Sequence, residues 1–481
     1  MPDDMRLVDE FMNVYHGGAR IGVGGQGMVL RTRDSDIALK ILCDRTTGAP
    51  LSDPAALAAA QARLQRLRVL PLPPGLALAG PVAALRDQAG YVMRLLDGMR
   101  SFDDVFASPR EALAGTAVPV WLGLVQSQDP RAAAQLADYA ATGASRVRLL
   151  QLARCAAVVA RLHAAGLVYG DLSPSNVFTS GVEADGQVWL IDADNLHFDG
   201  DPAAVNGFFT PGYGAPELVR GEAPPSLATD CHAFAVLAFK LLCLAHPFIG
   251  RQVKEGGWDA DCDPVQQAAR GELPWIHDAD DSNRGNEGLA PALACGAPLR
   301  QLFEECFGAG RLAPWRRPAM AHWPAALAAS ADLAINCGGC GMSWFALECA
   351  ACPYCQRPRP RLLRMESRRW LGDQKPDWTL LLPLDGLQSP VLLPARLFQP
   401  FTPAGFDEPV LSLQAEEGGY RLRRVGAAGP QLRIARAGAH GGRFEALENF
   451  HLDAAALAGE VAILAAGAPV RLVRLDVMEA T

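Results

Sequence analysis

The chain has 481 residues, which is too long for a single hydrophobic core and predicts two to four domains. Its formal net charge of −8 argues against a protein that coats nucleic acid or an anionic membrane, although a local basic patch remains compatible with it. These totals favour protein or small-molecule ligands.

The sequence predicts neither export nor membrane insertion. The first residues, MPDDMRLVDEFM, are acidic and lack the basic-then-apolar pattern of a signal peptide, so we expect a cytoplasmic protein. The most apolar stretch, residues 231–249, contains His232, Lys240 and His246, which favours a buried helix over a membrane span. Seven of the twelve cysteines are scattered singly, as suits a reducing compartment.

The predicted elements change character along the chain. Up to about residue 98 there are short β-type runs interrupted by glycines, with one helical stretch at 53–70. From about 100 to 325, apolar residues recur at three- and four-residue spacing, notably over 146–166, which predicts a larger helical region. From about 375 onward, alternating strand candidates are separated by Gly, Pro and Asp turns and predict a small all-β module.

A glycine-rich segment near the N-terminus is a candidate phosphate loop. The segment IGVGGQGMV has glycines at Gly22, Gly24 and Gly27, where a backbone without Cβ atoms could approach phosphates. Taken alone, this spacing favours a tight β-hairpin. Lys40 follows at the end of the strand-like run IALK, from which an ammonium group could reach the α- and β-phosphates of a nucleotide, and the combination favours phosphate binding.

Two later segments supply polar groups of the kind that phosphoryl transfer requires. Asp171 and Asn176 lie five residues apart in VYGDLSPSNV, and Asp192 follows the apolar run VWLI. Phosphoryl transfer needs Mg²⁺ held by oxygen ligands and an acceptor hydroxyl positioned beside a carboxylate. Asn176 and Asp192 are candidate Mg²⁺ ligands, and Asp171 is the candidate base.

Together these residues resemble the eukaryotic-like protein kinase family over roughly residues 15–325. TPGYGAPE at 210–217 matches the end of a kinase activation segment, and SLATDCHAFAVLAF at 226–239 matches the helix that supports the catalytic loop. The resemblance implies an α+β, bilobal kinase-like fold with an N-lobe at 1–98 and a C-lobe at 99–325. It also implies ATP and Mg²⁺ as cofactors, with Lys40, Asp171, Asn176 and Asp192 as the catalytic set.

The resemblance further assigns supporting and nucleotide-binding residues. Asp230 would organise the catalytic loop, Glu217 would pair with Arg317, and Thr210 would contact the catalytic base, which favours Ser/Thr acceptors. Met93 would be the gatekeeper in the strand and hinge YVMRLLDG. The nucleotide-binding residues would be Gly22, Gly24, Gly25, Gly27, Val29, Ala38, Lys40, Met93, Arg94, Leu96, Asn176 and Asp192.

The sequence departs from the kinase pattern at several positions. Tyr169 and Gly170 replace the His-Arg of the HRD motif, and DFG reads Asp-Ala-Asp at 192–194. In kinases that arginine receives an activation-loop phosphate, and residues 193–209 contain no Ser, Thr or Tyr. We therefore expect activity without activation-loop phosphorylation.

Two further departures concern the active-site cations. Ser173 replaces the catalytic-loop lysine, and the helical stretch at 53–70 contains no glutamate to pair with Lys40. Gln61 or Gln65 is the nearest polar candidate, and either would form a neutral hydrogen bond weaker than an ion pair. Retention of the base, both metal ligands and Lys40 favours an active kinase. A nucleotide-binding scaffold without turnover, contacting partners through its C-terminal modules, is the alternative.

Five cysteines gather between residues 337 and 355. The pairs Cys337/Cys340 and Cys352/Cys355 have the spacing of a tetrahedral Cys₄ zinc ribbon, expected at 333–358 and followed by the β-module at 375–481. Cys349 could replace Cys355 by pairing with Cys352, but the CPYC pattern favours the first set. A redox pair is the alternative, although the chain lacks a thioredoxin-like setting.

An arginine-rich segment, QRPRPRLLRMESRRW, follows the cysteines. We interpret it as a solvated link, and nucleic-acid binding is the alternative, which salt-dependent binding would expose. A kinase region followed by a Cys₄ ribbon resembles the bacterial kinases of tellurium-resistance-type gene clusters. That resemblance implies a von Willebrand A protein as substrate, docked by the ribbon or the β-module, and a metal-dependent phosphatase as a further partner. The arginines that a nucleic acid would contact in the alternative interpretation of this segment are Arg357, Arg359, Arg361, Arg364, Arg368 and Arg369.

Overall fold

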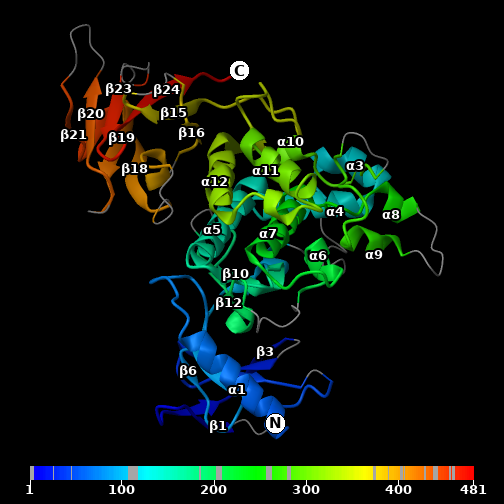
Figure 1. Cartoon of the computed structure of the whole chain (residues 1–481). Coiled ribbons are helices and arrows are strands. Elements are labelled where there is room, and N and C mark those ends of the chain that lie inside the picture. Colours follow the sequence, from blue (N-terminus) through cyan, green and yellow to red (C-terminus); the bar gives the residue numbers. More distant parts are fainter. Residues whose placement is uncertain are drawn as a thin grey trace.

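The computed structural model describes residues 5–481 with the exception of several short segments. These segments are 25–26, 45, 107–117, 184–185, 202–208, 256–262, 279–282, 286, 372–374, 388, 401–404, 406, 427–428, 437–442, 454–456 and 458–460. The fold is a mixed α+β arrangement, as predicted. An N-terminal β-sheet, a helical region and C-terminal β-sheets follow one another along the chain (Figure 1). A four-cysteine cluster lies in the sequence between the helical region and the C-terminal sheets.

The N-terminal lobe is built on a five-stranded antiparallel sheet. In spatial order its strands are β3 (Arg20–Gly24), β4 (Gly27–Arg31), β5 (Ile37–Leu42), β7 (Gly90–Arg94) and β6 (Ala83–Ala84). A hairpin of β1 (Met5–Val8) and β2 (Val14–Gly17) precedes it. The helix α1 (Pro54–Arg68) packs against β6 and β7, and Asp53 caps it by accepting the N–H of Ala56 at 2.8 Å.

The second lobe is mainly helical. Its helices are α2 (Phe102–Phe106), α3 (Gly123–Gln128), α4 (Pro130–Ala141), α5 (Ala144–Ala164), α6 (Pro216–Val219), α7 (Leu227–Cys243), α8 (Arg251–Glu255), α9 (Pro264–Ala269), α10 (Pro291–Ala294), α11 (Ala297–Phe307) and α12 (Trp323–Leu333). Its short strands are β8 (Arg100–Ser101), β9 (Leu167–Val168), β10 (Val177–Thr179), β11 (Val188–Leu190) and β12 (His197–Phe198). The central helices α5 and α7 supply much of the core.

The apolar stretch at 231–249 forms the buried helix α7 and then a turn. Ser226 and Thr229 form a reciprocal capping box that starts the helix. The helix ends at Cys243 because Leu244 adopts a φ of 57°, so the helical part is shorter than the apolar stretch. In the part of the chain that the structure describes, no helix is long and apolar enough to cross a membrane.

Two sheets make up the C-terminal β-module. The six-stranded sheet runs β16 (Trp378–Pro383), β15 (Leu362–Arg369), β24 (Arg471–Met478), β23 (Val461–Ala465), β20 (Leu432–Arg436) and β21 (Glu445–Ala446). The four-stranded sheet runs β17 (Val391–Pro394), β18 (Pro409–Glu416), β19 (Gly419–Arg424) and β22 (Asn449–Leu452). A shorter pair, β13 (Ala334–Asn336) and β14 (Ser343–Phe345), belongs to the cysteine-rich segment.

The module starts earlier than the sequence predicted. Much of the arginine-rich segment, interpreted above as a solvated link, forms β15, which pairs with both β16 and β24. Leu363, Met365 and Ser367 are buried on one face of this strand, while the arginines and Glu366 between them point outward. The two-residue alternation of a strand was therefore present, but the charged residues concealed it.

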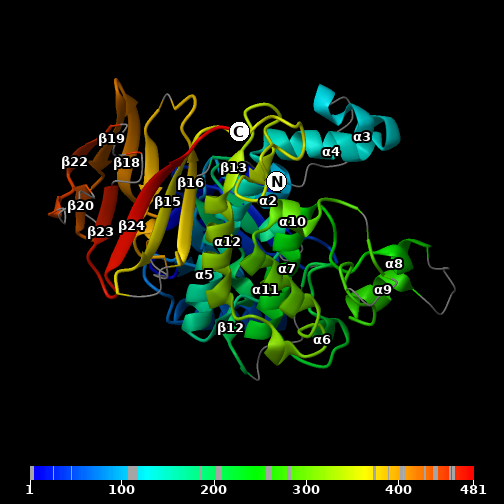
Figure 2. The same cartoon turned by 90° about the horizontal axis from the view of Figure 1, so that it is seen from above.

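A buried polar contact fixes the β-module to the helical lobe. Asp332 of α12 is fully buried and accepts hydrogen bonds from Trp378 Nε1 at 2.9 Å and from Arg396 Nε and Nη2 at 2.8 Å. Arg396 also pairs with Asp407, which in turn accepts from Arg154 Nε of α5 at 2.6 Å. Figure 2 shows β16 running beside α12, so the β-module contacts the helical lobe along these two elements.

Candidate active site

A cavity of about 850 Å³ is lined by residues of both lobes. This volume suits a small-molecule or nucleotide ligand. Most of the predicted nucleotide-site residues form its wall: Gly22, Gly27, Val29, Lys40, Met93, Arg94, Leu96, Asn176 and Asp192, joined by Asp171. Ala38 is fully buried on β5, Gly24 ends β3, and Gly25 lies outside the described residues. Sequence reasoning missed the apolar wall residues Ala79, Phe178 and Ile191. Ala79 and Phe178 lie in no recognisable motif, whereas Ile191 ends the run VWLI that precedes Asp192.

The glycine-rich segment forms the hairpin of β3 and β4, and its glycines serve different purposes. A Cβ on Gly27 would lie 2.4 Å from the carbonyl oxygen of Ile41, so close strand packing requires glycine there. A Cβ on Gly22 would meet nothing closer than 3.9 Å, and Gly22 lines the cavity. The same glycine-rich segment thus forms the hairpin that its spacing predicts and part of the cavity wall.

Lys40 reaches the cavity from β5 and pairs with two carboxylates. Its Nζ lies 2.5 Å from Asp192 Oδ1 and 2.7 Å from Asp194 Oδ2. Burial by itself lowers the pKa of Lys40, but the Asp194 and Asp192 carboxylates outweigh burial and hold that pKa above its ordinary value. Lys40 is therefore a fixed cation at the floor of the cavity.

The prediction that Gln61 or Gln65 would pair with Lys40 was wrong. Gln61 donates to the carbonyl oxygen of Arg86 at 3.3 Å, and Gln65 is exposed. Asp194 takes that place, because Asp192 adopts a left-handed conformation with a φ of 59° and starts a 3₁₀ turn, η3 (Ala193–Asn195). The sequence feature that could have indicated this partner is Asp194 itself, an acid at the position of the glycine in the DFG motif.

Asp171 faces the cavity and is held by two neighbours. Its Oδ1 accepts hydrogen bonds from both the backbone N–H and the hydroxyl of Thr210 at 2.9 Å. Asn176 Nδ2 donates to the Asp171 carbonyl oxygen at 2.9 Å and to Oδ2 at 3.2 Å. Burial raises the pKa of Asp171, while the Thr210 hydrogen bonds act in the opposite direction. The structure thus brings together Asp171, Thr210 and Asn176, to which the resemblance assigns the roles of base, contact of the base and metal ligand.

A pH profile tests the contact between Thr210 and Asp171. The hydroxyl hydrogen bond favours the ionised carboxylate, so Thr210→Val should raise the pKa of Asp171 further. If Asp171 must be ionised, activity is lost as the pH falls through that pKa, and the acidic limb of the kcat profile should move to higher pH in the variant. Thr210→Ser keeps the hydroxyl and should restore the original limb. An unchanged limb in Thr210→Val would contradict this role.

The loop that begins at Tyr169 rests on Asp230 at the start of α7. Asp230 accepts the N–H groups of Tyr169 at 2.7 Å and Gly170 at 2.9 Å. Gly170 has a φ of 88°, and a Cβ there would lie 3.3 Å from Asn195 Cβ. A glycine fits this left-handed position, which explains locally why the arginine of HRD is replaced. Tyr169 is fully buried, and its hydroxyl donates to the carbonyl oxygen of Ile191, just before Asp192.

Ser173, at the position of the catalytic-loop lysine, does not line the cavity. It is fully buried, and its Oγ lies 3.0 Å from the Oγ of Ser175, which does line it. A hydroxyl pair thus stands where kinases have an ammonium group. Among the described wall residues, Lys40 and Arg94 are the cationic side chains.

Glu217 and Arg317 form a buried bidentate ion pair. Arg317 Nη1 and Nη2 lie 2.6 and 2.8 Å from the two carboxylate oxygens, and both side chains are buried. Removing one partner leaves the other charge uncompensated, so we expect Arg317→Met to lower the free energy of unfolding by roughly 3–5 kcal/mol. Denaturant unfolding measures this. Glu222→Gln removes an exposed carboxylate that pairs with Arg220, and it should change stability little.

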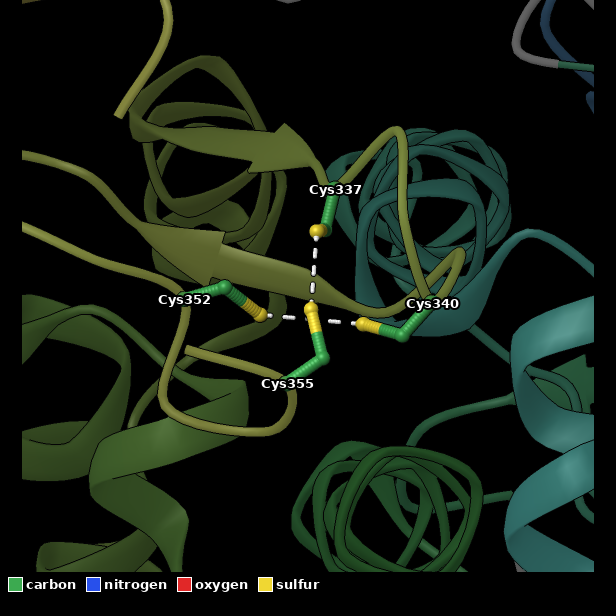
Figure 3. Close-up of side chains that lie close together, drawn as sticks. All are labelled: Cys337, Cys340, Cys352 and Cys355. Carbon is green, nitrogen blue, oxygen red and sulfur yellow. Dashed lines mark hydrogen bonds between the residues drawn. The ribbon is translucent and has the colours of Figure 1, made fainter. Parts of the chain in front are cut away.

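Four cysteine thiols converge at the side of the helical lobe. Figure 3 shows Cys337, Cys340, Cys352 and Cys355 pointing toward one another. Their four sulfur atoms all lie within 4.8 Å of one another. The Cys337–Cys355 and Cys340–Cys352 sulfurs are 3.5 and 3.6 Å apart. A tetrahedron with Zn–S bonds of about 2.3 Å has edges of about 3.8 Å, so the four thiols fit a structural zinc ion. Cys349 is exposed and outside the cluster, so Cys355 is the fourth cysteine of the cluster, as the CPYC pattern predicts.

The cysteine cluster lies between the helical lobe and the β-module. The ring of Tyr354 meets Trp121 edge to face at 6.2 Å, and Ser343 Oγ accepts the N–H of Arg146 in α5 at 3.0 Å. Leu362 of β15 and Leu381 of β16 belong to the same apolar cluster as Cys340 and Cys352. A metal bound here would therefore stabilise a three-way contact between the ribbon, the helical lobe and the β-module.

The arginines after the cysteines make local ion pairs. Arg364 lies 2.6 Å from Asp476 on β24 and 3.5 Å from Glu366, and Arg361 lies 3.4 Å from Glu479. These acids offset part of the positive charge that the arginine-rich sequence suggests. The geometry therefore gives little support to the nucleic-acid alternative.

Comparison with known proteins gives distant similarities. No protein-family model matches the chain. It is 24% identical over 301 residues to the calcium-dependent protein kinase 9 of Oryza sativa subsp. japonica, covering 58% of this chain and 44% of that protein. It is 32% identical over 90 residues to the calcium/calmodulin-dependent protein kinase type 1B of Rattus norvegicus, covering 19% and 26%. The chain thus spans less than half the length of these curated relatives, and it is distantly similar to Ser/Thr protein kinases.

Proposed function

We propose that the protein is an ATP- and Mg²⁺-dependent protein kinase that transfers the γ-phosphate to Ser or Thr of a protein partner. The observation that carries the proposal is the convergence of Lys40, Asp171, Asn176 and Asp192 on one cavity of about 850 Å³. Distant similarity to Ser/Thr protein kinases supports the reaction class.

The geometry suggests a role for each group. Lys40 has three N–H donors, of which two point to Asp192 and Asp194, so one remains for a nucleotide phosphate. Asn176 donates through Nδ2 to Asp171, which leaves its amide oxygen as the atom available to a metal ion beside Asp192. When bound there, Mg²⁺ would supply positive charge to the phosphates.

Asp171 would orient the acceptor hydroxyl and receive its proton. Oδ1 already accepts two hydrogen bonds from Thr210, so Oδ2 is the oxygen with more remaining acceptor capacity. The substrate oxygen forms a bond to the γ-phosphorus as the bond to the ADP leaving oxygen breaks, and the proton passes to Asp171. Gly170 leaves no arginine to receive an activation-loop phosphate, which supports activity without such phosphorylation.

By the resemblance of its domain order, the partner would be a von Willebrand A protein, counteracted by a metal-dependent phosphatase. The test is incubation with labelled ATP and Mg²⁺, alone and with such a protein, for wild type, Asp171→Ala and Asp192→Ala. Label on Ser or Thr that is lost in both variants supports the proposal, and label on Tyr would contradict its acceptor class.

A nucleotide-binding scaffold is the second candidate. It is favoured by the uncharged Ser173 and by the ion pairs that already occupy Lys40. Binding of ATP without transfer in the same experiment, with the purified partner present, would select this alternative.

A further inference from the structure

Asp194 is the most thoroughly buried carboxylate around the cavity, with 1% of its surface exposed. Its Oδ2 lies 2.7 Å from Lys40 Nζ, and its Oδ1 accepts the hydroxyl hydrogen of Tyr91 at 2.7 Å. Lys40 and Tyr91 are directly opposite each other on the paired strands β5 and β7. The N-terminal sheet therefore holds Asp194 through two neighbouring side chains.

The helix α1 offers no acid for this purpose. Residues Pro54–Arg68 contain no Asp or Glu, and the buried residues of the helix are Leu64 and Leu67. The helix contacts η3, the turn that carries Asp194. Its contribution to the site is thus packing against the turn rather than an ion pair.

We infer that Asp194 is the positioning residue for Lys40, taking the part that an acid on α1 would otherwise play. The inference rests on the proposed function, since it concerns how Lys40 is set to meet the phosphates. Asp194 belongs to the segment that also carries Asp192. The placement of Lys40 therefore depends on the Asp-Ala-Asp turn and on Tyr91, and it is independent of any ion pair to α1.

A metal-ligand role for Asp194 fits the geometry less well. Asp192 lines the cavity, whereas Asp194 is not among the wall residues of that cavity. Both oxygens of Asp194 already have partners, Lys40 and Tyr91. Asp194 is therefore oriented toward the N-terminal sheet and away from the space that a nucleotide and its metal would fill.

The test measures covalent labelling of Lys40 by an adenosine analogue that carries an amine-reactive sulfonyl fluoride. The neutral amine displaces fluoride, and one proton is released. The Asp194 carboxylate lies 2.7 Å from Lys40 Nζ and favours the protonated amine. Asp194→Asn removes that charge and keeps Asp192, at 2.5 Å, so it should shift the labelling profile to lower pH. Each unit of that shift raises the neutral fraction about tenfold at a fixed pH well below the pKa. We therefore expect Asp194→Asn to be labelled faster than the wild-type protein at pH 7.5.

Three further variants make the test specific. Tyr91→Phe removes only the hydroxyl that anchors Asp194, so it should shift the profile in the same direction by less, and it serves if Asp194→Asn does not fold. Asp97→Asn, an exposed carboxylate paired with Arg31, should leave the profile unchanged. Gln61→Ala on α1 should also leave it unchanged. Unshifted profiles in folded Asp194→Asn and Tyr91→Phe, or a shift in Gln61→Ala, would overturn the inference.

This readout separates the inference from the proposed kinase activity. Labelling needs an adenosine site beside Lys40 but no phosphate transfer, so a protein without turnover can still show the Asp194 effect. Failure of the wild-type protein to be labelled at Lys40 would overturn both the nucleotide site and the role of Asp194. In a protein that turns over, Mg²⁺ titration adds a check. Substitution of a positioning residue lowers kcat/KM without changing the Mg²⁺ concentration needed for the half-maximal rate. Substitution of a metal ligand changes that concentration.

Discussion

Replacing Asp171 by Asn is expected to lower kcat by roughly 10²–10⁴-fold while ATP affinity changes little. The substitution keeps the size of the side chain, which can stay beside Thr210 and Asn176. It removes the carboxylate that accepts the proton. Steady-state kinetics together with a separate ATP-binding measurement give both quantities.

The matched control for this experiment is Asp87→Asn, which makes the same chemical change at an exposed position between β6 and β7. Its kcat should equal that of the wild-type protein. Retention of more than about a tenth of wild-type kcat in Asp171→Asn would mean that another group serves as the base.

Disruption of the four-cysteine cluster is expected to have the largest effect on stability. Structural zinc contributes about 10–16 kcal/mol to the folding of zinc-finger peptides. Here the four thiols lie in an apolar cluster shared with the helical lobe and the β-module. Cys340→Ser should therefore abolish stoichiometric zinc and lower the unfolding temperature, through loosening of the contacts around Trp121 and Leu381.

Cys349→Ser is a close control, because Cys349 belongs to the same segment but is exposed and outside the cluster. Its zinc content and unfolding temperature should match those of the wild-type protein. Metal analysis and thermal unfolding measure the two quantities. Full zinc content in Cys340→Ser would show that the ion is held by other residues.

The parts of the site that could be predicted are those encoded by short, ordered motifs. Glu217 and Arg317 are 100 residues apart but come together because each belongs to a recognisable segment of one lobe. The same holds for Asp230 beneath Tyr169 and Gly170. The two C-x-x-C pairs predict their own convergence, because each pair forms a local turn and four thiols suit one metal ion.

The partner of Lys40 could not be predicted in the same way. It depends on the left-handed backbone of Asp192, which turns Asp194 back toward β5, and a single sequence gives little information on that conformation. The attachment of the β-module was also hidden, since Asp332 and Arg396 are 64 residues apart and neither lies in a motif. In β15, outward arginines concealed a strand whose other face is buried.

The most direct test of the proposed kinase activity uses ATP labelled at either of two positions. Purified protein with Mg²⁺ and a protein acceptor is incubated with γ-labelled ATP in one reaction and α-labelled ATP in another. A site built from Lys40, Asp171, Asn176 and Asp192 predicts protein-bound label from γ-labelled ATP alone, and its loss in Asp171→Asn. Label from α-labelled ATP would indicate nucleotidyl transfer. No label from either, with ATP binding intact, would contradict kinase activity in favour of a nucleotide-binding scaffold.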